Sequence, residues 1–127
     1  MNELKVLICD DSILIRKKLK NLLEICEVKI VEEAVDGQDA IDKLEIFNPD
    51  VIFLDIVMPN KDGIETLIEI KQKCSKVKVI MASSVGTQTN LKKALENGAY
   101  DFIQKPVTLE SIKSILEKIV KEGYENV

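Results

Sequence analysis

The hydrophobic and polar positions of the chain follow two alternating patterns. Five short runs are rich in apolar and β-branched residues, and most of them are apolar at every position. Such runs are typical of parallel strands that helices cover on both faces of a sheet. The expected strands are Lys5–Cys9, Lys29–Val35, Val51–Leu54, Lys78–Ser83 and Tyr100–Gln104. The second run alternates more between apolar and polar residues, which favours a place at the edge of the sheet.

The longer segments between these runs have the period of amphipathic helices. Apolar residues recur at helical spacing in Ile15–Cys26 and again in Leu109–Ile119. Ser12 and Thr108 stand at positions typical of helix N-caps, and Gly98 stands where a helix would stop. Shorter helices are expected around Ala40–Leu44, Ile64–Ile68 and Leu91–Leu95.

Five strands alternating with helices predict a doubly wound α/β fold of the (βα)5 type. Its parallel five-stranded sheet would lie between two layers of helices. The length of 127 residues suits one domain, which we expect over residues 1–127, with a core from about 4 to 121 and a short polar C-terminal tail. In such sheets, ligands bind beyond the carboxyl ends of the strands, where the strand order reverses.

Polar residues stand at four of these strand ends. In the stretch VIFLDIVMPNKDG, four apolar residues run directly into Asp55. The first run leads into Asp10 and Asp11, the fourth ends at Ser83, and Lys105 follows the fifth. Because parallel strands bring their carboxyl ends to one edge of the sheet, we expect these side chains around one shallow cleft.

This combination predicts phosphoryl chemistry. Three carboxylates that lie close together repel one another, and a hard divalent cation with oxygen ligands, such as Mg²⁺, relieves the repulsion. The cation, Lys105 and a hydroxyl could then position a phosphoryl group while Asp55 attacks it to form an aspartyl phosphate. Each residue alone has a simpler explanation as a turn residue, a helix cap or a solvated charge. Their joint placement carries the hypothesis.

The composition narrows the class of protein. The chain has no His, which excludes His-based metal sites and His general bases within it. A net charge of −4 argues against nucleic acid as the partner. Three scattered Cys residues without a CxxC motif favour reduced thiols in the cytoplasm. The apolar runs are too short to span a membrane, and the N-terminus lacks signal-peptide features, so we expect a cytoplasmic protein without membrane association.

Four motifs have the spacing of one known family: LICDDS with Arg16 following, FLDIVMPNKDG, VIMASS and NGAYDFIQKP. On these motifs, from about Lys5 to Val120, the chain resembles the receiver domain of two-component response regulators. The resemblance implies the flavodoxin-like receiver fold with strand order 2-1-3-4-5. It also implies a phosphoacceptor signalling domain rather than an enzyme, with self-catalysed phosphorylation and dephosphorylation.

The resemblance assigns roles to the acidic residues. It implies that Asp55 is the phosphoacceptor and also a metal ligand, and that Asp10 and Asp11 hold Mg²⁺, Asp11 directly and Asp10 largely through water. The backbone carbonyl of Val57 would complete the metal ligands. The apolar side chain of Val57 stands at a position that helps to tune phosphate hydrolysis in this family.

Further roles concern switching. By resemblance, Ser83 moves toward the phosphoryl group, Lys105 contacts its oxygens, and Lys105 and Pro106 are joined by a cis peptide. Phe102 takes the place of the rotating aromatic switch, with Phe where Tyr is more frequent. These positions leave the switching detail and the phosphate lifetime open.

The resemblance also implies partners. A sensor histidine kinase or phosphotransfer protein would supply the phosphoryl group, and an output protein would bind the face of the fourth helix, the fifth strand and the fifth helix. We expect that face to carry a basic surface, and we expect a monomer or weak dimer. The residues of that surface are Lys92, Lys93, Lys113 and Lys118.

A stand-alone chemotaxis-type regulator that binds the flagellar motor switch is the expected subtype. The alternative is a stand-alone or excised receiver from another phosphorelay or transcriptional pathway. An aspartyl-nucleophile phosphatase is disfavoured because Val57 stands where that class needs a second Asp. A flavodoxin-like cofactor module is disfavoured because the loops lack a Gly-rich or hydroxyl-rich phosphate cradle. A pseudo-receiver that only binds partners is disfavoured because the acidic residues and the Lys are all present.

Overall fold

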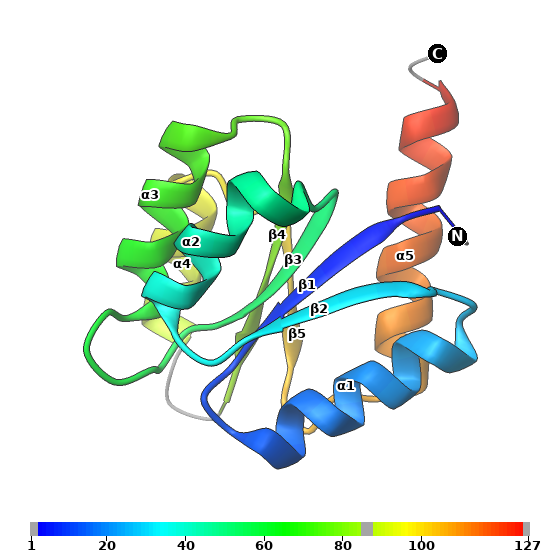
Figure 1. Ribbon diagram of the computed structural model, residues 1–127, viewed down its shortest axis with the longest axis horizontal. Helices are drawn as coiled ribbons and strands as arrows, with labels where there is room; N and C mark the ends of the chain where they lie inside the picture. Colours follow the sequence, from blue (N-terminus) through cyan, green and yellow to red (C-terminus); the bar gives the residue numbers. More distant parts are fainter. Residues whose placement is uncertain (1–2, 85–87, 126–127) are drawn as a thin grey trace.

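The computed structural model describes residues 3–84 and 88–125 and confirms the doubly wound α/β architecture (Figure 1). Strands and helices alternate along this part of the chain. The strands are β1 (Lys5–Cys9), β2 (Ile30–Ala34), β3 (Val51–Asp55), β4 (Lys78–Ser83) and β5 (Asp101–Gln104). The helices are α1 (Ile13–Ile25), α2 (Gly37–Phe47), α3 (Gly63–Lys73), α4 (Gln88–Glu96) and α5 (Leu109–Glu125).

The strands are parallel and lie in the order β2-β1-β3-β4-β5, as predicted. The alternating strand β2 lies at an edge of the sheet, which confirms that prediction too. The chain passes from β1 outward to β2 and then crosses to β3 on the other side of β1, so the strand order reverses between β1 and β3. The register pairs Cys9 with Leu54, and this places the residues that follow β1 beside the end of β3.

Two hydrophobic layers enclose the sheet. Helices α2, α3 and α4 cover one face, and α1 and α5 cover the other (Figure 1). Along β3, Ile52 and Leu54 face the first layer whereas Val51 and Phe53 face the second. Every residue of β3 is buried. This burial on both faces explains why β3 is an unbroken apolar run that ends in one carboxylate.

The predicted helix caps at Ser12 and Thr108 and the predicted stop at Gly98 are confirmed. The Ser12 hydroxyl accepts a hydrogen bond from the backbone N–H of Ile15 at 3.3 Å, and the Thr108 hydroxyl accepts one from Ser111 at 3.2 Å. Each satisfies a backbone donor that the first turn of a helix leaves unpaired. Gly98 has a φ of +100°, which a residue with a side chain rarely adopts, and it follows the end of α4.

The predicted end of the last helix near Lys121 is wrong. Helix α5 continues to Glu125, through residues that we expect from the sequence to form a polar tail. Its apolar stripe ends at Ile119, but Lys and Glu are good helix formers and continue the helix without a buried face. The Tyr100 hydroxyl also donates a hydrogen bond of 2.6 Å to the Glu122 carboxylate, which links this part of α5 to the residue before β5.

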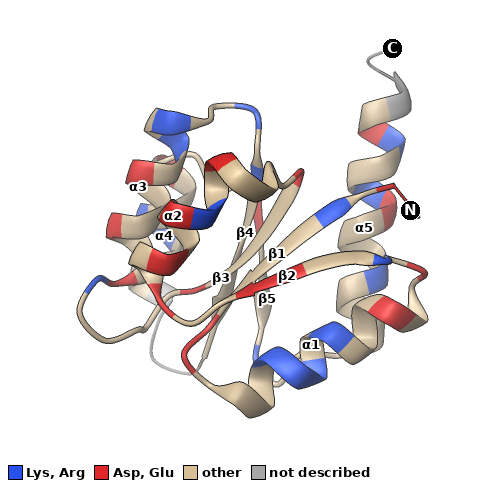
Figure 2. Cartoon of the chain, viewed as in Figure 1, with Lys and Arg blue, Asp and Glu red and all other residues tan. Residues whose placement is uncertain are grey.

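A basic run occupies α1, and acidic residues lie along β2 (Figure 2). The predicted basic surface on α4, β5 and α5 needs correction. Lys113 instead lies beside the end of α1, where it lines a cavity of about 310 Å³ together with Cys26. Lys118 stays beside β5 as predicted, but its charge is paired with that of Asp101, the first residue of β5, at 3.3 Å. Among the described residues, no helix has the length and apolar character that crossing a membrane requires.

Candidate functional site

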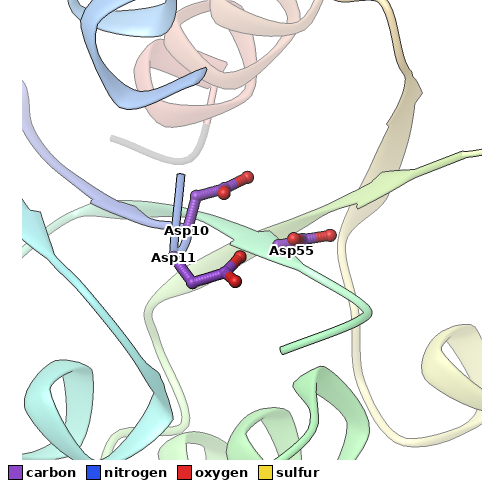
Figure 3. A group of neighbouring side chains, drawn as sticks. All are labelled: Asp10, Asp11 and Asp55. Atoms are coloured by element: carbon purple, nitrogen blue, oxygen red, sulfur yellow. The ribbon is translucent and has the colours of Figure 1, made fainter. Parts of the chain in front are cut away.

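Three carboxylates meet where β1 and β3 end. Asp10 and Asp11 follow β1, and Asp55 is the last residue of β3. One oxygen from each of the three lies within 4.8 Å of the others (Figure 3). Asp10 and Asp55 are buried, with exposed fractions of 2% and 8%, whereas Asp11 is exposed. The juxtaposition predicted from the strand ends is therefore present in the structure.

Lys105 joins this cluster from the end of β5. Its Nζ lies 2.9 Å from Asp10 Oδ2 and 3.2 Å from Asp55 Oδ2. The peptide bond between Lys105 and Pro106 is cis, as the resemblance implies. The structure thus brings Lys105 together with the acidic residues.

Asp10 is held at each of its four polar groups. Its backbone N–H donates to the carbonyl of Ala34 at 3.2 Å, and its own carbonyl accepts from Arg16 Nη1 at 2.7 Å. Its Oδ1 accepts from the backbone N–H of Ser12 at 2.8 Å, and its Oδ2 accepts from Lys105. Asp10 is therefore oriented by the fold itself. This agrees with an indirect role at a metal, while the exposed Asp11 is open to direct coordination.

The electrostatics of the site favour an additional cation. Burial raises the pKa of Asp55 above its ordinary value and the charge of Asp10 adds to the rise, while Lys105 and the N–H of Val57 oppose it. Burial lowers the pKa of the Lys105 ammonium, but its hydrogen bond to Asp10 and the charges of both carboxylates outweigh this and leave the pKa raised. One ammonium therefore stays charged beside three carboxylates without compensating them fully.

The donor set fits Mg²⁺. It consists of carboxylate oxygens, which are hard ligands, and the exposure of Asp11 leaves room for the waters that Mg²⁺ retains. The Cys9 thiol, a soft ligand, has other partners: it donates to the Asp36 carbonyl at 3.2 Å and lies 3.7 Å from Met58 Sδ. The N–H of Val57 donates to Asp55 Oδ1 at 3.3 Å, so Val57 lies alongside the cluster. The metal role of its carbonyl stays a prediction.

The two predicted switch residues lie on β4 and β5, the strands beyond β3. Ser83, the last residue of β4, is buried, and its hydroxyl lies 3.5 Å from the carbonyl of Ile103 in β5. The backbone N–H of Lys105 donates to the Ser83 carbonyl at 2.7 Å, which ties the two strand ends together. Phe102 lies on β5 with 42% of its surface exposed, so its ring is directed outward in this structure.

Gly63 shapes the loop after Asp55, a role that the sequence pattern does not reveal. Its N–H donates to the carbonyl of Ile56 at 2.8 Å. A Cβ at this position would lie 2.3 Å from the Asp55 carbonyl oxygen and 2.7 Å from the Cα of Ile56. Only glycine permits this approach, although in the sequence it is simply the residue after a turn.

Arg16 is the second residue whose part in the site is missed. The sequence shows it only as a member of a motif, and a charged residue on an amphipathic helix is normally expected on the exposed face. In the structure it is buried and contacts the backbone of Asp10. A possible signal is its place on the same helical stripe as the buried Leu19 and Leu23.

Comparison with known proteins decides the family. Residues 6–117 match the family described as the response regulator receiver domain. The chain belongs to this family. The receiver is 40% identical over 118 residues to the chemotaxis protein CheY of Listeria monocytogenes, an alignment that covers 93% of this chain and 99% of that protein.

Two further relatives define the range of similarity. The receiver is 37% identical over 131 residues to the protein-glutamate methylesterase/protein-glutamine glutaminase of Clostridium acetobutylicum, covering 98% of this chain but 38% of that protein. A response regulator receiver domain protein from Clostridium thermocellum has a TM-score of 0.90 at 26% identity, covering 98% and 99% of the two chains. The predicted family, fold class and signalling class are thus confirmed.

Proposed function

We propose that this receiver accepts a phosphoryl group on Asp55 in a Mg²⁺-dependent reaction and thereby switches the binding of a partner protein. One observation carries the proposal: the Asp55 carboxylate lies within 4.8 Å of those of Asp10 and Asp11, and its Oδ2 is 3.2 Å from Lys105 Nζ. A nucleophile, metal ligands and a cation for phosphoryl oxygens are therefore adjacent.

The residues divide the chemistry between them. An Asp55 oxygen attacks the phosphorus of the donor, so that a P–O bond forms while the bond from phosphorus to the leaving group breaks. Asp11 and Asp55 would hold Mg²⁺ directly, Asp10 largely through water, with the Val57 carbonyl as a further ligand. The bound cation would neutralise charge that gathers on the phosphoryl oxygens. Lys105 is near enough to pair with one of these oxygens, and Ser83 would donate a hydrogen bond to another.

Exposed apolar residues beside the site support a protein as phosphodonor. Ile13 and Leu14 begin the first turn of α1, one residue after the acidic pair, and are 71% and 78% exposed. Val57, two residues after Asp55, is 60% exposed. A partner that presents a phosphohistidine could cover these side chains. A sensor histidine kinase or phosphotransfer protein in the cytoplasm is the partner that this proposal requires.

The proposed role is that of a single-domain chemotaxis-type regulator. Its support is the alignment over 99% of the Listeria CheY protein. The output partner would bind the face of α4, β5 and α5, and the flagellar motor switch is the candidate in such a pathway. The alternative is a receiver that belongs to another output, which the similarity to part of the methylesterase favours.

Phosphorylation with a small donor tests the proposal. The protein is incubated with acetyl phosphate and Mg²⁺, or with excess chelator, and its intact mass is measured. We expect one phosphoryl adduct that requires Mg²⁺ and that Asp55→Asn abolishes. Asp42→Asn, which removes an exposed carboxylate on α2, is the matched control and should label like the wild type. Labelling of Asp55→Asn, or full labelling in chelator, would contradict the proposal.

A further inference from the structure

Arg16 is a buried cation that touches the acidic turn without belonging to the carboxylate cluster. Its Nη1 donates a hydrogen bond of 2.7 Å to the backbone carbonyl of Asp10, and its Nε lies 3.1 Å from Glu33 Oε1. We propose that Arg16 is a positioning residue for the metal: it fixes the peptide group between Asp10 and Asp11 and so sets the affinity of the site for Mg²⁺. The inference rests on the proposed function.

The burial of Arg16 calls for an explanation. Its exposed fraction is 8%, and burying a guanidinium is costly unless it is paired and hydrogen-bonded. The described residues include five buried polar or charged side chains, and Arg16 is the only cation among them. Three of the others, Asp10, Asp55 and Ser83, stand at the strand ends of the site.

The ion pair that Arg16 forms with Glu33 links α1 to β2, but such a link does not require a buried side chain. Lys20 lies one turn further along α1 and reaches the same carboxylate, with Nζ 3.7 Å from Glu33 Oε2. Its side chain is 54% exposed, so a link from α1 to the edge strand can be made at the surface. What Arg16 adds is the contact with Asp10, which Lys20 does not share.

The planar peptide group explains how that contact reaches the metal ligand. The carbonyl oxygen that Arg16 holds is coplanar with the N–H and Cα of Asp11. Fixing the oxygen therefore fixes where the Asp11 Cα lies, and the Asp11 carboxylate extends from that atom. Asp11 is exposed at the cluster, so its orientation depends more on its backbone than on packing. Groups that orient metal ligands typically change metal affinity 10- to 100-fold when they are removed.

Three variants separate this role from a structural one. Arg16→Met removes the donors and keeps the length of the side chain. Arg16→Lys keeps the charge but loses the fork that reaches Asp10 and Glu33 together. Lys20→Met removes the other partner of Glu33. Mg²⁺ is titrated into each protein while the amide resonances of residues 10–12 are followed, and urea denaturation without Mg²⁺ reports stability separately.

We expect Mg²⁺ affinity to fall about 10-fold in Arg16→Met, to be intermediate in Arg16→Lys and to stay near the wild-type value in Lys20→Met. The amides of Asp11 and Ser12 should shift in metal-free Arg16→Met and not in Lys20→Met. Wild-type affinity in Arg16→Met, or equal losses in Arg16→Met and Lys20→Met, would overturn the inference. If Arg16→Met does not fold, wild-type affinity in Arg16→Lys overturns it. Absence of Mg²⁺ binding by the wild type would instead refute the proposed function.

Discussion

The ammonium group of Lys105 forms ion pairs with both Asp10 and Asp55. Its Nζ lies 2.9 Å from Asp10 Oδ2 and 3.2 Å from Asp55 Oδ2. The same lysine that would bind a phosphoryl oxygen thus links the ends of β1, β3 and β5 before any phosphate is present. A metal ion and a phosphoryl group would both have to compete with these contacts.

Replacing Lys105 by Met should have opposite effects on folding and on metal binding. The free energy of unfolding without Mg²⁺ should fall by about 2–3 kcal/mol, because two buried carboxylates lose their partner. The affinity for Mg²⁺ should rise, because a competing cation is gone. Urea denaturation in chelator and Mg²⁺ titration measure the two effects. Lys92→Met, at an exposed position of α4, should change neither. Weaker Mg²⁺ binding in Lys105→Met would contradict the competition.

Asp55→Asn should stabilise the metal-free protein at neutral pH. Burial raises the pKa of Asp55 above its ordinary value of 3.8, so the folded state holds this proton more tightly than the unfolded chain. The stabilising contribution of Asp55 is complete below about pH 3.8 and is lost as the pH rises through the folded-state pKa.

Asn carries no charge, so the unfolding free energy of Asp55→Asn does not fall in this way as the pH rises. At pH 7 we expect Asp55→Asn to exceed the wild type in unfolding free energy by on the order of 1 kcal/mol, and at pH 4 the difference should shrink. Urea denaturation at both pH values in chelator tests this. A wild type that is more stable at pH 7 would show that Lys105 outweighs the burial of Asp55.

Gly63→Ala should destabilise the fold by about 1–3 kcal/mol, because the added Cβ would meet the backbone of Asp55 and Ile56 at 2.3 and 2.7 Å. Gly123→Ala is a matched control within α5, where a Cβ would meet nothing within 4 Å. That control should be stabilised by roughly 0.5–1 kcal/mol, because Ala favours a helix. Urea denaturation of both variants measures these changes. Equal stabilities would show that the loop after Asp55 adjusts to the added Cβ at little cost.

Formation of a phosphoryl mimic should change the face of α4, β5 and α5. Ser83 contacts the carbonyl of Ile103 through its hydroxyl, so a movement of Ser83 toward Asp55 would release a contact to β5 beside Phe102. We expect amide shifts in residues 83–84 and 101–105 and in α4 when beryllofluoride and Mg²⁺ are added. The amides in the middle of α2 serve as the control. Changes confined to residues 55–62 would contradict this route.

The sequence predicts the sheet well because its central strands, β1, β3 and β4, are buried almost throughout. The predicted bounds of β1 and β4 agree with the structure, since each run begins at a Lys and is followed by a polar residue. The meeting of Asp10, Asp11 and Asp55 follows from the parallel direction of β1 and β3 alone.

Features that depend on lateral packing could not be predicted in this way. Lys113 lies beside Cys26 because α1 and α5 share a face of the sheet, and the period of α5 alone does not show which neighbour a given polar residue meets. The last turns of α5 carry no apolar stripe, so periodicity gives no signal for them. The period of α1 places Arg16 on the stripe of Leu19 and Leu23, but it does not show that the guanidinium meets the backbone carbonyl of Asp10.

The loop after Asp55 is held on several sides. Ile56 accepts from Gly63 and donates to the carbonyl of Ala82 at 3.2 Å, and Met58 lies 3.7 Å from the buried Cys9 thiol. We expect these contacts to resist displacement of the loop. When a group is added to Asp55, we therefore expect the residues that move to be Ser83 and Lys105. The stiffness of one loop would in this way give the signal its direction.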